Sequence, residues 1–269
     1  MSAGLGGAEG PGDSQRQFSR VAEAYRRSPT HADPVSLARF LELAQLRPNH
    51  KVLDVATGTG NVALAAAPDV AEVVGLDITS SMLEQARMQA AEREIRNVRF
   101  VRADAEMLPY PAHSFDRVLV RSAPHHFLNL IKSLAEAYRV LRPGGVYAVS
   151  DCSPPPVVRD WLEVVELGRD PSHVRSRALE EWRALLQGVG FTVEQAERIE
   201  QEKDVLQWFD LVRLPERRKR KLLDYYETAP QAVRSQLLGQ WREGRLYHRY
   251  WHAMIRARRP LQVAARSGR

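Results

Sequence analysis

The chain has 269 residues, of which 44% are hydrophobic and 27% charged, and its 39 Lys and Arg residues outnumber its 33 Asp and Glu residues. This composition is too apolar for a disordered chain and too poor in Gly and Pro for a collagen. No apolar run approaches the ~20 residues that span a bilayer, and no signal-peptide pattern opens the chain, so we expect a cytoplasmic protein. A single cysteine, Cys152, excludes an internal disulfide and a cysteine zinc cluster.

Two segments, 213–221 and 256–269, concentrate the basic residues. Runs of this kind are typical of a solvated helix face or a frayed end. The first run has no interleaved aromatic residues, which stacking on single-stranded nucleic acid would require. We therefore do not expect a nucleic-acid partner, although the positive charge keeps one open as an alternative.

The first 48 residues are predicted to be disordered and then helical. Residues 1–13 are small and Gly-rich. Apolar residues then recur at helical spacing from Phe18 to Tyr25 and from Leu37 to Ala44, which predicts two amphipathic helices.

From residue 49 the pattern alternates between strands and helices. Strands are predicted at 51–56, 72–77, 97–103, 115–121 and 146–150, and the sequence from Ser81 to Glu84 resembles a helix capping box. This alternation predicts a mostly parallel sheet with helices on both faces. After a Pro-rich connector come two helices, a strand near 190–193, a charged helical insertion at 203–238 and a last strand at 247–258, which we expect to be antiparallel.

A glycine loop follows the first of these strands. Gly58 to Ala63 reads G-x-G-x-x-A, in which the glycines allow a sharp turn and the close approach of a ligand. Asp77 lies 19 residues after Gly58, at the end of the second strand. There a carboxylate accepts hydrogen bonds from both hydroxyls of a ribose, unless it caps the next helix instead.

Charge distinguishes the two adenosine-containing ligands that suit such a loop. A dinucleotide places a diphosphate over the loop, whereas S-adenosylmethionine carries a sulfonium, an ammonium and one carboxylate. Asp54, Asp77 and Asp104 come near the ends of three consecutive strands, so their carboxylates should gather at one rim of the sheet. This rim favours the cationic ligand.

Taken in order, these segments resemble the motifs of the class I S-adenosylmethionine-dependent methyltransferases. The matching segments are Val52 to Gly60, Val74 to Asp77, Arg102 to Glu106 and the late turn Leu141 to Gly145. The lead-in from Phe18 and the stretch His125-His126-Phe127 are similar to the small-molecule branch that includes ubiquinone and menaquinone biosynthesis (methyltransferase type 11). The resemblance extends over about 18–152.

The resemblance implies a fold and a domain organisation. The fold would be an α/β, Rossmann-like, mostly parallel sheet of seven strands with helices on both faces. An N-terminal helical lid and a helical insertion before the last strand would complete it. The implied divisions are a disordered N-terminus at 1–13, a lid at 14–48, a core at 49–202 and 239–258, the insertion at 203–238 on the substrate side, and a basic tail at 259–269.

The resemblance also implies contacts with the methionine and ribose parts of the cofactor. Asp54 would orient the ammonium, and Asp77 would hold the ribose hydroxyls. The backbone of the loop would pass along the methionine part at Ala56, Thr57, Gly58 and Gly60.

Further contacts follow from the same resemblance. Ile78 would lie against the adenine, whose edge would meet Asp104 and the N–H of Ala105. Arg121 would lie near the methionine part or the substrate entrance, and Tyr25 would belong to the lid.

The implied reaction is an in-line displacement that methylates carbon or oxygen of a small acceptor, such as a quinol-like or other planar metabolite, and leaves S-adenosylhomocysteine. His125 and His126 are candidate general bases, because a neutral imidazole accepts a proton near pH 7. Either could instead pack or bond to the backbone. A metal held by this pair is not expected, because adjacent side chains diverge and a third ligand is not evident.

Alternatives from other classes stay open: an RNA methyltransferase, a nicotinamide-dependent oxidoreductase, or a non-catalytic S-adenosylmethionine-binding protein. Cys152 follows the fifth strand, where RNA cytosine methyltransferases carry a nucleophile, but Arg121 to Pro124 lacks their second cysteine. We expect a buried, inert thiol. The sequence leaves open the acceptor, a monomer or a homodimer, and whether four aromatic residues line the acceptor pocket or merely pack: Trp208, Phe209, Tyr225 and Tyr226.

Overall fold

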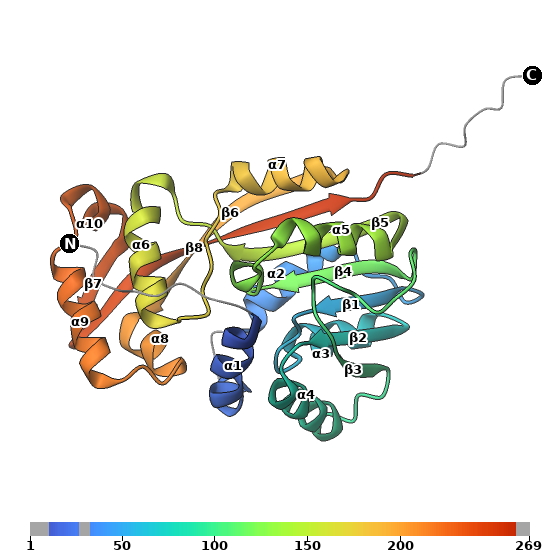
Figure 1. Ribbon diagram of the computed structural model, residues 1–269, viewed down its shortest axis with the longest axis horizontal. Helices are drawn as coiled ribbons and strands as arrows, with labels where there is room; N and C mark the ends of the chain where they lie inside the picture. The colour runs from blue at the N-terminus through green and yellow to red at the C-terminus, as the bar shows by residue number, and fades with distance from the viewer. Residues whose placement is uncertain (1–10, 27–32, 262–269) are drawn as a thin grey trace, which may run out of the picture.

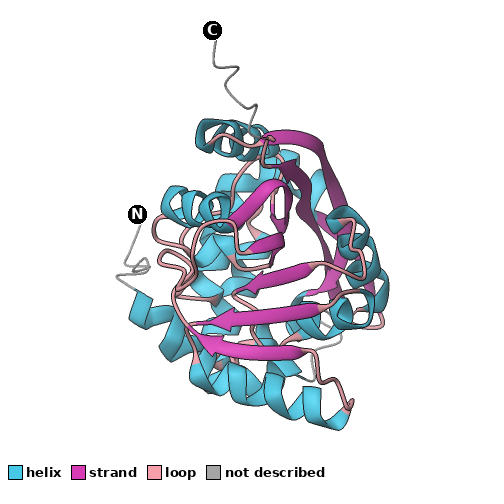
Figure 2. Cartoon of the chain, turned by 90° about the vertical axis from the view of Figure 1, so that its right-hand side faces the viewer, coloured by secondary structure: helices cyan, strands magenta, loops and turns pink. Residues whose placement is uncertain are grey.

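A sheet runs the length of the molecule and carries helices on both faces (Figures 1 and 2). The computed structural model describes residues 11–26 and 33–261. Within them the sheet has eight strands, seven in the order β3-β2-β1-β4-β5-β8-β6, with β7 paired to β8. The strands are β1 (Lys51–Val55), β2 (Glu72–Asp77), β3 (Val98–Arg102), β4 (Phe115–Arg121), β5 (Leu141–Cys152), β6 (Thr192–Asp204), β7 (Leu238–Arg242) and β8 (Arg245–Arg258).

The first five strands are parallel, and β8 lies antiparallel between β5 and β6. The predicted Rossmann-like, mostly parallel sheet is therefore confirmed, with β7 as a short extra strand in a hairpin with β8. Strands β1 and β4 lie in the middle of the sheet, and both faces are covered there. This explains their continuous apolar runs, since Val52, Leu53 and Leu119 are fully buried.

The helices divide between the two faces and one end of the sheet. Side chains of α2 and α3 pack on one face around Phe40, and those of α5 and α7 pack on the other around Trp182. Of the helices in the described ranges, none combines the length and apolar character needed to cross a membrane. The helices are α1 (Pro11–Arg26), α2 (Pro34–Ala44), α3 (Asn61–Ala66), α4 (Ser80–Glu92), α5 (Leu130–Val140), α6 (Pro156–Arg169), α7 (Leu179–Val189), α8 (Val205–Leu211), α9 (Glu216–Glu227) and α10 (Gln231–Leu237).

A second core lies at one end of the molecule, on the left in Figure 1. There α6, α8, α9 and α10 pack with the outer ends of β6 and β8 around Trp161, Phe209 and Tyr226. We call this unit the outer module. It includes the predicted insertion at 203–238, but α6 and the two strand ends also belong to it.

Strand β6 is much longer than the short strand expected near 190–193. It runs from Thr192 to Asp204 and pairs with β8 along this length. Most of its residues are polar, because β6 is an edge strand and only Ile199 and Asp204 along it are buried. Lys203, which the sequence assigned to the insertion, is therefore the penultimate residue of a sheet strand.

Three other boundaries differ from expectation. Helix α4 begins at Ser80 after Thr79, so Ser81 lies inside the helix and the expected capping box is not formed. Helix α1 begins at Pro11, within the segment expected to be disordered, and residues 1–10 lie outside the described part. Arg259, expected in the basic tail, is buried, and its guanidinium donates to the carbonyls of Tyr138 and Leu141.

Candidate functional site

A cavity opens at the carboxyl ends of the parallel strands, and its lining comes from two sides. The loops after β1, β2 and β3 form the first side, with Asp54, Asp77 and Asp104; we call it the rim half. The second side comes from α1, α6, α8 and the outer ends of β6 and β8, and includes Arg169 and Lys203. We call it the module half.

The turn from β1 into α3 is built around the carboxylate of Asp54. Ala56 and Gly58 both take the left-handed backbone conformation, with φ of 55°, which allows the chain to reverse direction. The hydroxyl of Thr57 donates to Asp54 Oδ2 over 2.5 Å, and the backbone N–H of Ala63 donates to the same oxygen over 3.1 Å. One buried carboxyl thus holds both the loop and the first turn of α3.

Asp77, at the end of β2, joins two loops. Its carboxylate accepts hydrogen bonds from the backbone N–H of Gly58 at 2.9 Å and of Thr79 at 2.8 Å. The second bond closes the turn before α4, so Asp77 makes a capping-type contact although Thr79 is the N-cap residue. Each carboxylate oxygen has a further lone pair that can accept from a ligand hydroxyl.

Burial dominates the electrostatics of this rim. Asp54 is 1% exposed and Asp77 8%. Burial raises the pKa of Asp54 to about 7 and raises that of Asp77 above its ordinary value, although hydrogen bonds to both carboxylates oppose the shifts. A positively charged ligand in the cavity would therefore stabilise the ionised forms of both side chains.

The remaining predicted residues of the rim also line the cavity, with one exception. Ile78, Asp104 and Ala105 contribute to the lining, and Asp104 Oδ1 accepts from the backbone N–H of Glu106 at 2.8 Å. Gly60 is not among the lining residues.

Gly60 acts in packing instead. It precedes α3 with a φ of 86°, and a Cβ placed there would lie 3.0 Å from the Cβ of Ala86 and 3.2 Å from the ring of Phe100. The glycine therefore allows the loop to approach α4 and β3 closely.

Helix α1 contributes to the module half of the cavity and carries two aromatic residues into it. Tyr25 lines the cavity, and the ring of Phe18 lies 5.0 Å from that of His126. Burial raises the pKa of the Tyr25 hydroxyl, which keeps it protonated at neutral pH. Arg121, at the end of β4, also lines the cavity, and its guanidinium donates to the hydroxyl of Ser36 over 3.1 Å.

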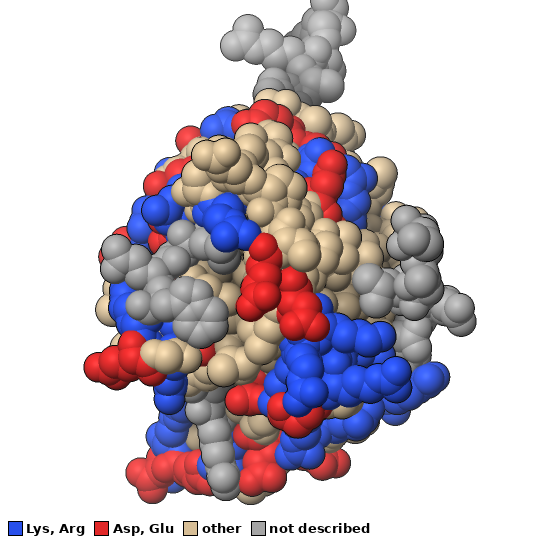
Figure 3. All heavy atoms as spheres, turned by 90° about the vertical axis from the view of Figure 1, so that its left-hand side faces the viewer, with Lys and Arg blue, Asp and Glu red and all other residues tan. Residues whose placement is uncertain are grey.

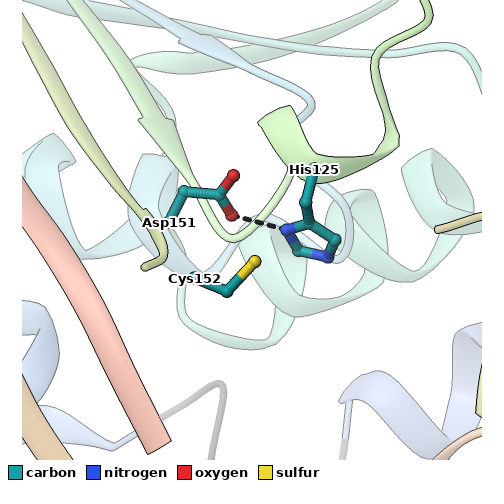
Figure 4. Close-up of side chains that lie close together, drawn as sticks. All are labelled: His125, Asp151 and Cys152. Atoms are coloured by element: carbon teal, nitrogen blue, oxygen red, sulfur yellow. Dashed lines mark hydrogen bonds and ion pairs between the residues drawn. The ribbon is translucent and has the colours of Figure 1, made fainter. Parts of the chain in front are cut away.

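The two predicted histidines lie side by side in the cavity wall, with ring centroids 4.0 Å apart. His125 Nδ1 lies 2.5 Å from Asp151 Oδ1, and Figure 4 shows its second ring nitrogen on the far side of the ring. His126 Nδ1 donates to the carbonyl oxygen of Ser172 over 3.0 Å. Burial lowers the pKa of both imidazoles, that of His125 strongly, so both are neutral at pH 7.

Asp151 was not singled out from the sequence. Burial raises the pKa of this carboxyl to about 7. Like Asp54 and Asp77, Asp151 lies near the carboxyl end of a strand, in this case β5. That position could have identified it as a site residue from the sequence. Of the adjacent residues Asp151 and Cys152, only Cys152 was a candidate from the sequence.

Cys152 is a buried thiol whose Sγ donates to the hydroxyl of Ser176 over 3.2 Å. Burial raises its pKa well above the ordinary value, which disfavours the nucleophilic thiolate. The ligand atoms of His125, Asp151 and Cys152 lie within 4.8 Å of one another (Figure 4). They could hold a metal ion only if the His125–Asp151 contact opened and the thiol lost its proton.

The module half contains a cluster of charged and polar side chains that was not predicted from the sequence. Glu166 Oε2 lies 3.2 Å from Arg169 Nη1, and the hydroxyl of Tyr250 donates to Glu166 Oε1 over 2.6 Å. Lys203 lies over the ring of Tyr250, with Nζ 3.2 Å from the centroid. These residues come from α6, β6 and β8, so only the folded sheet and module bring them together.

The four aromatic residues of the insertion have different roles. Trp208 lines the cavity, and the guanidinium of Arg169 lies 4.3 Å from its ring centroid. Phe209 and Tyr226 are buried in the core of the outer module. Tyr225 stacks on Trp161.

Comparison with known proteins gives consistent matches. A family model described as a methyltransferase domain matches residues 46–213. The chain is 39% identical over 174 residues to the uncharacterized methyltransferase YcgJ of Bacillus subtilis, a stretch that covers 64% of this chain and 69% of that relative. It is 41% identical over 146 residues to a demethylmenaquinone methyltransferase of Thermus thermophilus, covering 52% and 66% respectively.

A solved structure agrees with these matches. The crystal structure of the YcgJ protein aligns with a TM-score of 0.79 at 30% identity, covering 84% of this chain and 98% of that one.

The substitution Asp54→Asn tests the effect of burial on this carboxyl. Between about pH 5 and 7 the folded protein keeps a proton on Asp54 that the unfolded chain has lost, so this group makes stability fall as the pH rises. Asn offers an oxygen to Thr57 and Ala63 and does not ionise. The variant should therefore gain stability relative to the wild type as the pH rises, by on the order of a few kcal/mol.

Urea unfolding measures this gain in the free energy of unfolding. It is carried out at pH 5 and at pH 8, on either side of the titration of Asp54. Asp224→Asn, at an exposed position on α9, is the matched control and should show no gain. A stability difference between Asp54→Asn and the wild type that does not change with pH would contradict the raised pKa.

Proposed function

Because the chain belongs to the methyltransferase-domain family of S-adenosylmethionine-dependent enzymes, we propose that its cavity binds S-adenosylmethionine and transfers the methyl group to a small planar acceptor. The acceptor atom would be carbon or oxygen. The observation that supports this proposal most directly is the pair of buried carboxylates, Asp54 and Asp77, at the rim half of the cavity.

The rim fits the charge and shape of this cofactor. Asp54 would attract the ammonium, which would favour the ionised form of a carboxyl whose pKa burial has raised. Asp77 would accept from the ribose hydroxyls with its remaining lone pairs. A Cβ built at Gly58 would have open space around it, so the loop leaves room there for a ligand to approach the backbone.

The purine would lie farther along the rim. Ile78 and Ala105 line this part of the cavity, with Asp104 beside them. The Asp104 carboxylate would accept from the exocyclic amino group, and the apolar side chains would contact the ring faces. Gly60 is not assigned to the cofactor, because it packs against α4 and β3.

The cofactor supplies a methyl group on an electron-poor sulfur, which is a good leaving group. The tasks left to the protein are alignment and exclusion of water. Helix α1 contacts both α4 and α8, so it spans the two halves of the cavity (Figure 1). The side-chain amide of Gln15 on this helix donates to the carbonyl of Ile78 over 3.3 Å. Helix α1 would thus act as the lid.

His125 is the proposed general base for an acceptor that must lose a hydroxyl proton. With Nδ1 facing Asp151, the second ring nitrogen can accept a proton. The carboxylate would then stabilise the imidazolium and fix the ring orientation. His126 donates to a backbone carbonyl, so we propose a positioning role for it through its contact with Phe18.

A planar acceptor is supported by the aromatic lining of the module half. Trp208 and Tyr250 lie in its wall, and one relative in the comparison is a demethylmenaquinone methyltransferase. A quinol or a related ring with an acidic hydroxyl suits both this wall and the proposed base.

Charge argues against two alternatives. A dinucleotide would bring a diphosphate beside the carboxylates of Asp54 and Asp77. The surface at the outer module mixes Lys and Arg with Asp and Glu (Figure 3), and Lys219 on α9 is paired with Asp210 and with Glu216. A basic face divided by acidic residues fits an RNA backbone poorly.

Calorimetric titration of the purified protein with S-adenosylmethionine, S-adenosylhomocysteine and NAD⁺ tests the proposal. We expect both sulfur compounds to bind and NAD⁺ to bind at least about tenfold more weakly, because its diphosphate meets the rim carboxylates. Binding of NAD⁺ without binding of S-adenosylmethionine would reject the proposal in favour of an oxidoreductase.

The role of His125 requires an acceptor, which turnover assays on a panel of quinols, catechols and phenols would provide. With such an acceptor, His125→Gln should lower kcat by about 10²–10⁴, the usual contribution of a general base, and leave S-adenosylhomocysteine affinity unchanged. Asp151→Asn should lower kcat by a smaller factor, and Asp224→Asn on α9 should have no effect. Wild-type kcat in His125→Gln would show that the reaction needs no base at this position.

A further inference from the structure

Lys203 lies in the module half of the cavity, with its ammonium against aromatic rings. Its Nζ lies 3.2 Å from the ring centroid of Tyr250 and 5.7 Å from that of Trp208. In the described ranges 11–26 and 33–261, no hydrogen bond or ion pair to this nitrogen is found. Ring faces stabilise an ammonium less than a carboxylate does. The side chain is half-buried, and a lysine with reduced exposure and no hydrogen-bonded acidic partner is unusual in a folded protein.

Strand β6 directs Lys203 into the cavity. Gln201 and Lys203 both line it, two residues apart, as alternation along a strand requires. Between them, Glu202 pairs with Arg242 of β7. Asp204, the next residue, caps α8 by accepting from the N–H of Gln207. The register with β8 therefore fixes the position of the amine.

The neighbouring acidic side chains already have other partners. The carboxylate of Glu166 accepts from Tyr250 and pairs with Arg169, whose guanidinium also lies against the ring of Trp208. Asp170, also in the wall, accepts from the hydroxyl and the N–H of Ser172. Glu166 still raises the pKa of Lys203 through its charge, but both acids form their hydrogen bonds and ion pairs with groups other than Nζ.

The charged and titratable groups around Lys203 come from every element packed on it. They are Glu166 and Arg169 of α6, Arg121 of β4, Cys152 of β5, and His248 and Tyr250 of β8. Burial lowers the pKa of Lys203 to about 7; Arg169 and Arg121 act in the same direction, and Glu166 and Cys152 oppose the shift in part. An anion beside Nζ would reverse part of this shift and gain a charge-assisted hydrogen bond.

We propose that Lys203 binds an acidic group of the methyl acceptor, so that the acceptor is a planar monoanion such as an aromatic carboxylate or an ionised phenol. This inference rests on the proposed function, because it assigns the acceptor to the cavity half that S-adenosylmethionine would leave free. The ring of the acceptor would contact Trp208 and Tyr250. A dianion such as a phosphate ester is disfavoured, because Glu166 and Asp170 lie in the same wall.

The test uses matched pairs of small ring compounds as probes. The carboxylate arm compares benzoate, salicylate and 4-hydroxybenzoate with the corresponding amides. The phenolate arm compares 4-nitrophenol with 4-nitroanisole. Affinities are measured by ligand-observed NMR with saturating S-adenosylhomocysteine, on the wild type, Lys203→Met and Lys203→Arg. Lys132→Met, at an exposed position on α5, is the matched control.

For at least one pair in one arm, the wild type should bind the anion at least about tenfold more tightly than its neutral partner. Lys203→Met should reduce this ratio to about twofold or less, because it keeps a chain of similar length without the charge. Lys203→Arg and Lys132→Met should keep the preference. A preference in the carboxylate arm would identify the acidic group of the acceptor as a carboxylate, and a preference in the phenolate arm would identify it as a phenolate.

Two results would overturn the inference. Neutral probes that bind as well as anions across both arms would show that the pocket takes uncharged acceptors. An anion preference that survives in Lys203→Met would show that another cation, such as Arg169 or Arg121, holds the acid. If Lys203→Met does not fold, the wild type is tested alone. Its preference for each anion over the neutral partner, with the phenol affinity corrected for the fraction of the probe that is ionised, must decline from pH 6 to pH 9 as Lys203 loses its proton.

Failure of this inference can be distinguished from failure of the proposed function. S-Adenosylhomocysteine binding is measured first, and its absence in the wild type would contradict the proposed function itself. Binding of S-adenosylhomocysteine together with no anion preference would contradict only the role of Lys203.

Discussion

The structure depends on the burial of acidic groups at one rim of a parallel sheet. Asp54 and Asp77 are almost fully enclosed, and burial raises the pKa of each. Their hydrogen bonds come mostly from the backbone of the loops they hold, so these carboxyl groups shape the turns. When Asp54 ionises, Arg121 offsets its negative charge only in part, because the pKa stays raised. A ligand that carries positive charge would stabilise the ionised carboxylates most. The loop geometry and the charge of the site therefore both suit the proposed cofactor.

Different parts of the fold form the two halves of the cavity, and we propose a different role for each half. The rim half is made by short loops between adjacent parallel strands, whose carboxyl ends meet by topology. The module half depends on β6 and β8 extending past the sheet into the outer module, where α6 and α8 pack against them (Figure 1). The proposed cofactor contacts therefore depend on local loops, and the proposed acceptor contacts depend on the outer module.

The rim could be predicted from the sequence, because its geometry is local. Gly58, Asp54 and Asp77 each follow or end a buried apolar run, and parallel strands place such positions at one edge. Gly60 was predicted to contact the cofactor from the same motif, and a motif does not separate a glycine that faces a ligand from one that packs against a helix. The structure places Gly60 against Ala86 and Phe100.

The module half could not be predicted, because its residues meet only through long-range pairing. Lys203 lies in a polar edge strand, whose sequence does not show the apolar alternation that marks strands with a buried face. Glu166 and Arg169 lie on α6, far from Tyr250 in the sequence, and nothing local indicates that they meet. The position of Asp151 near the end of β5 could have indicated a site residue. Its contact with His125 could not be predicted, because it depends on how the turn Pro124–His126 before α5 folds.

The most direct measurement of the central claim is the number of protons released when S-adenosylmethionine binds. Calorimetry near pH 6.5 in two buffers of different ionisation enthalpy gives this number. A cation beside Asp54 should displace the proton that burial retains, so the wild type should release a substantial fraction of a proton more than Asp54→Asn. Equal release by the two proteins, or net uptake by the wild type alone, would contradict the account.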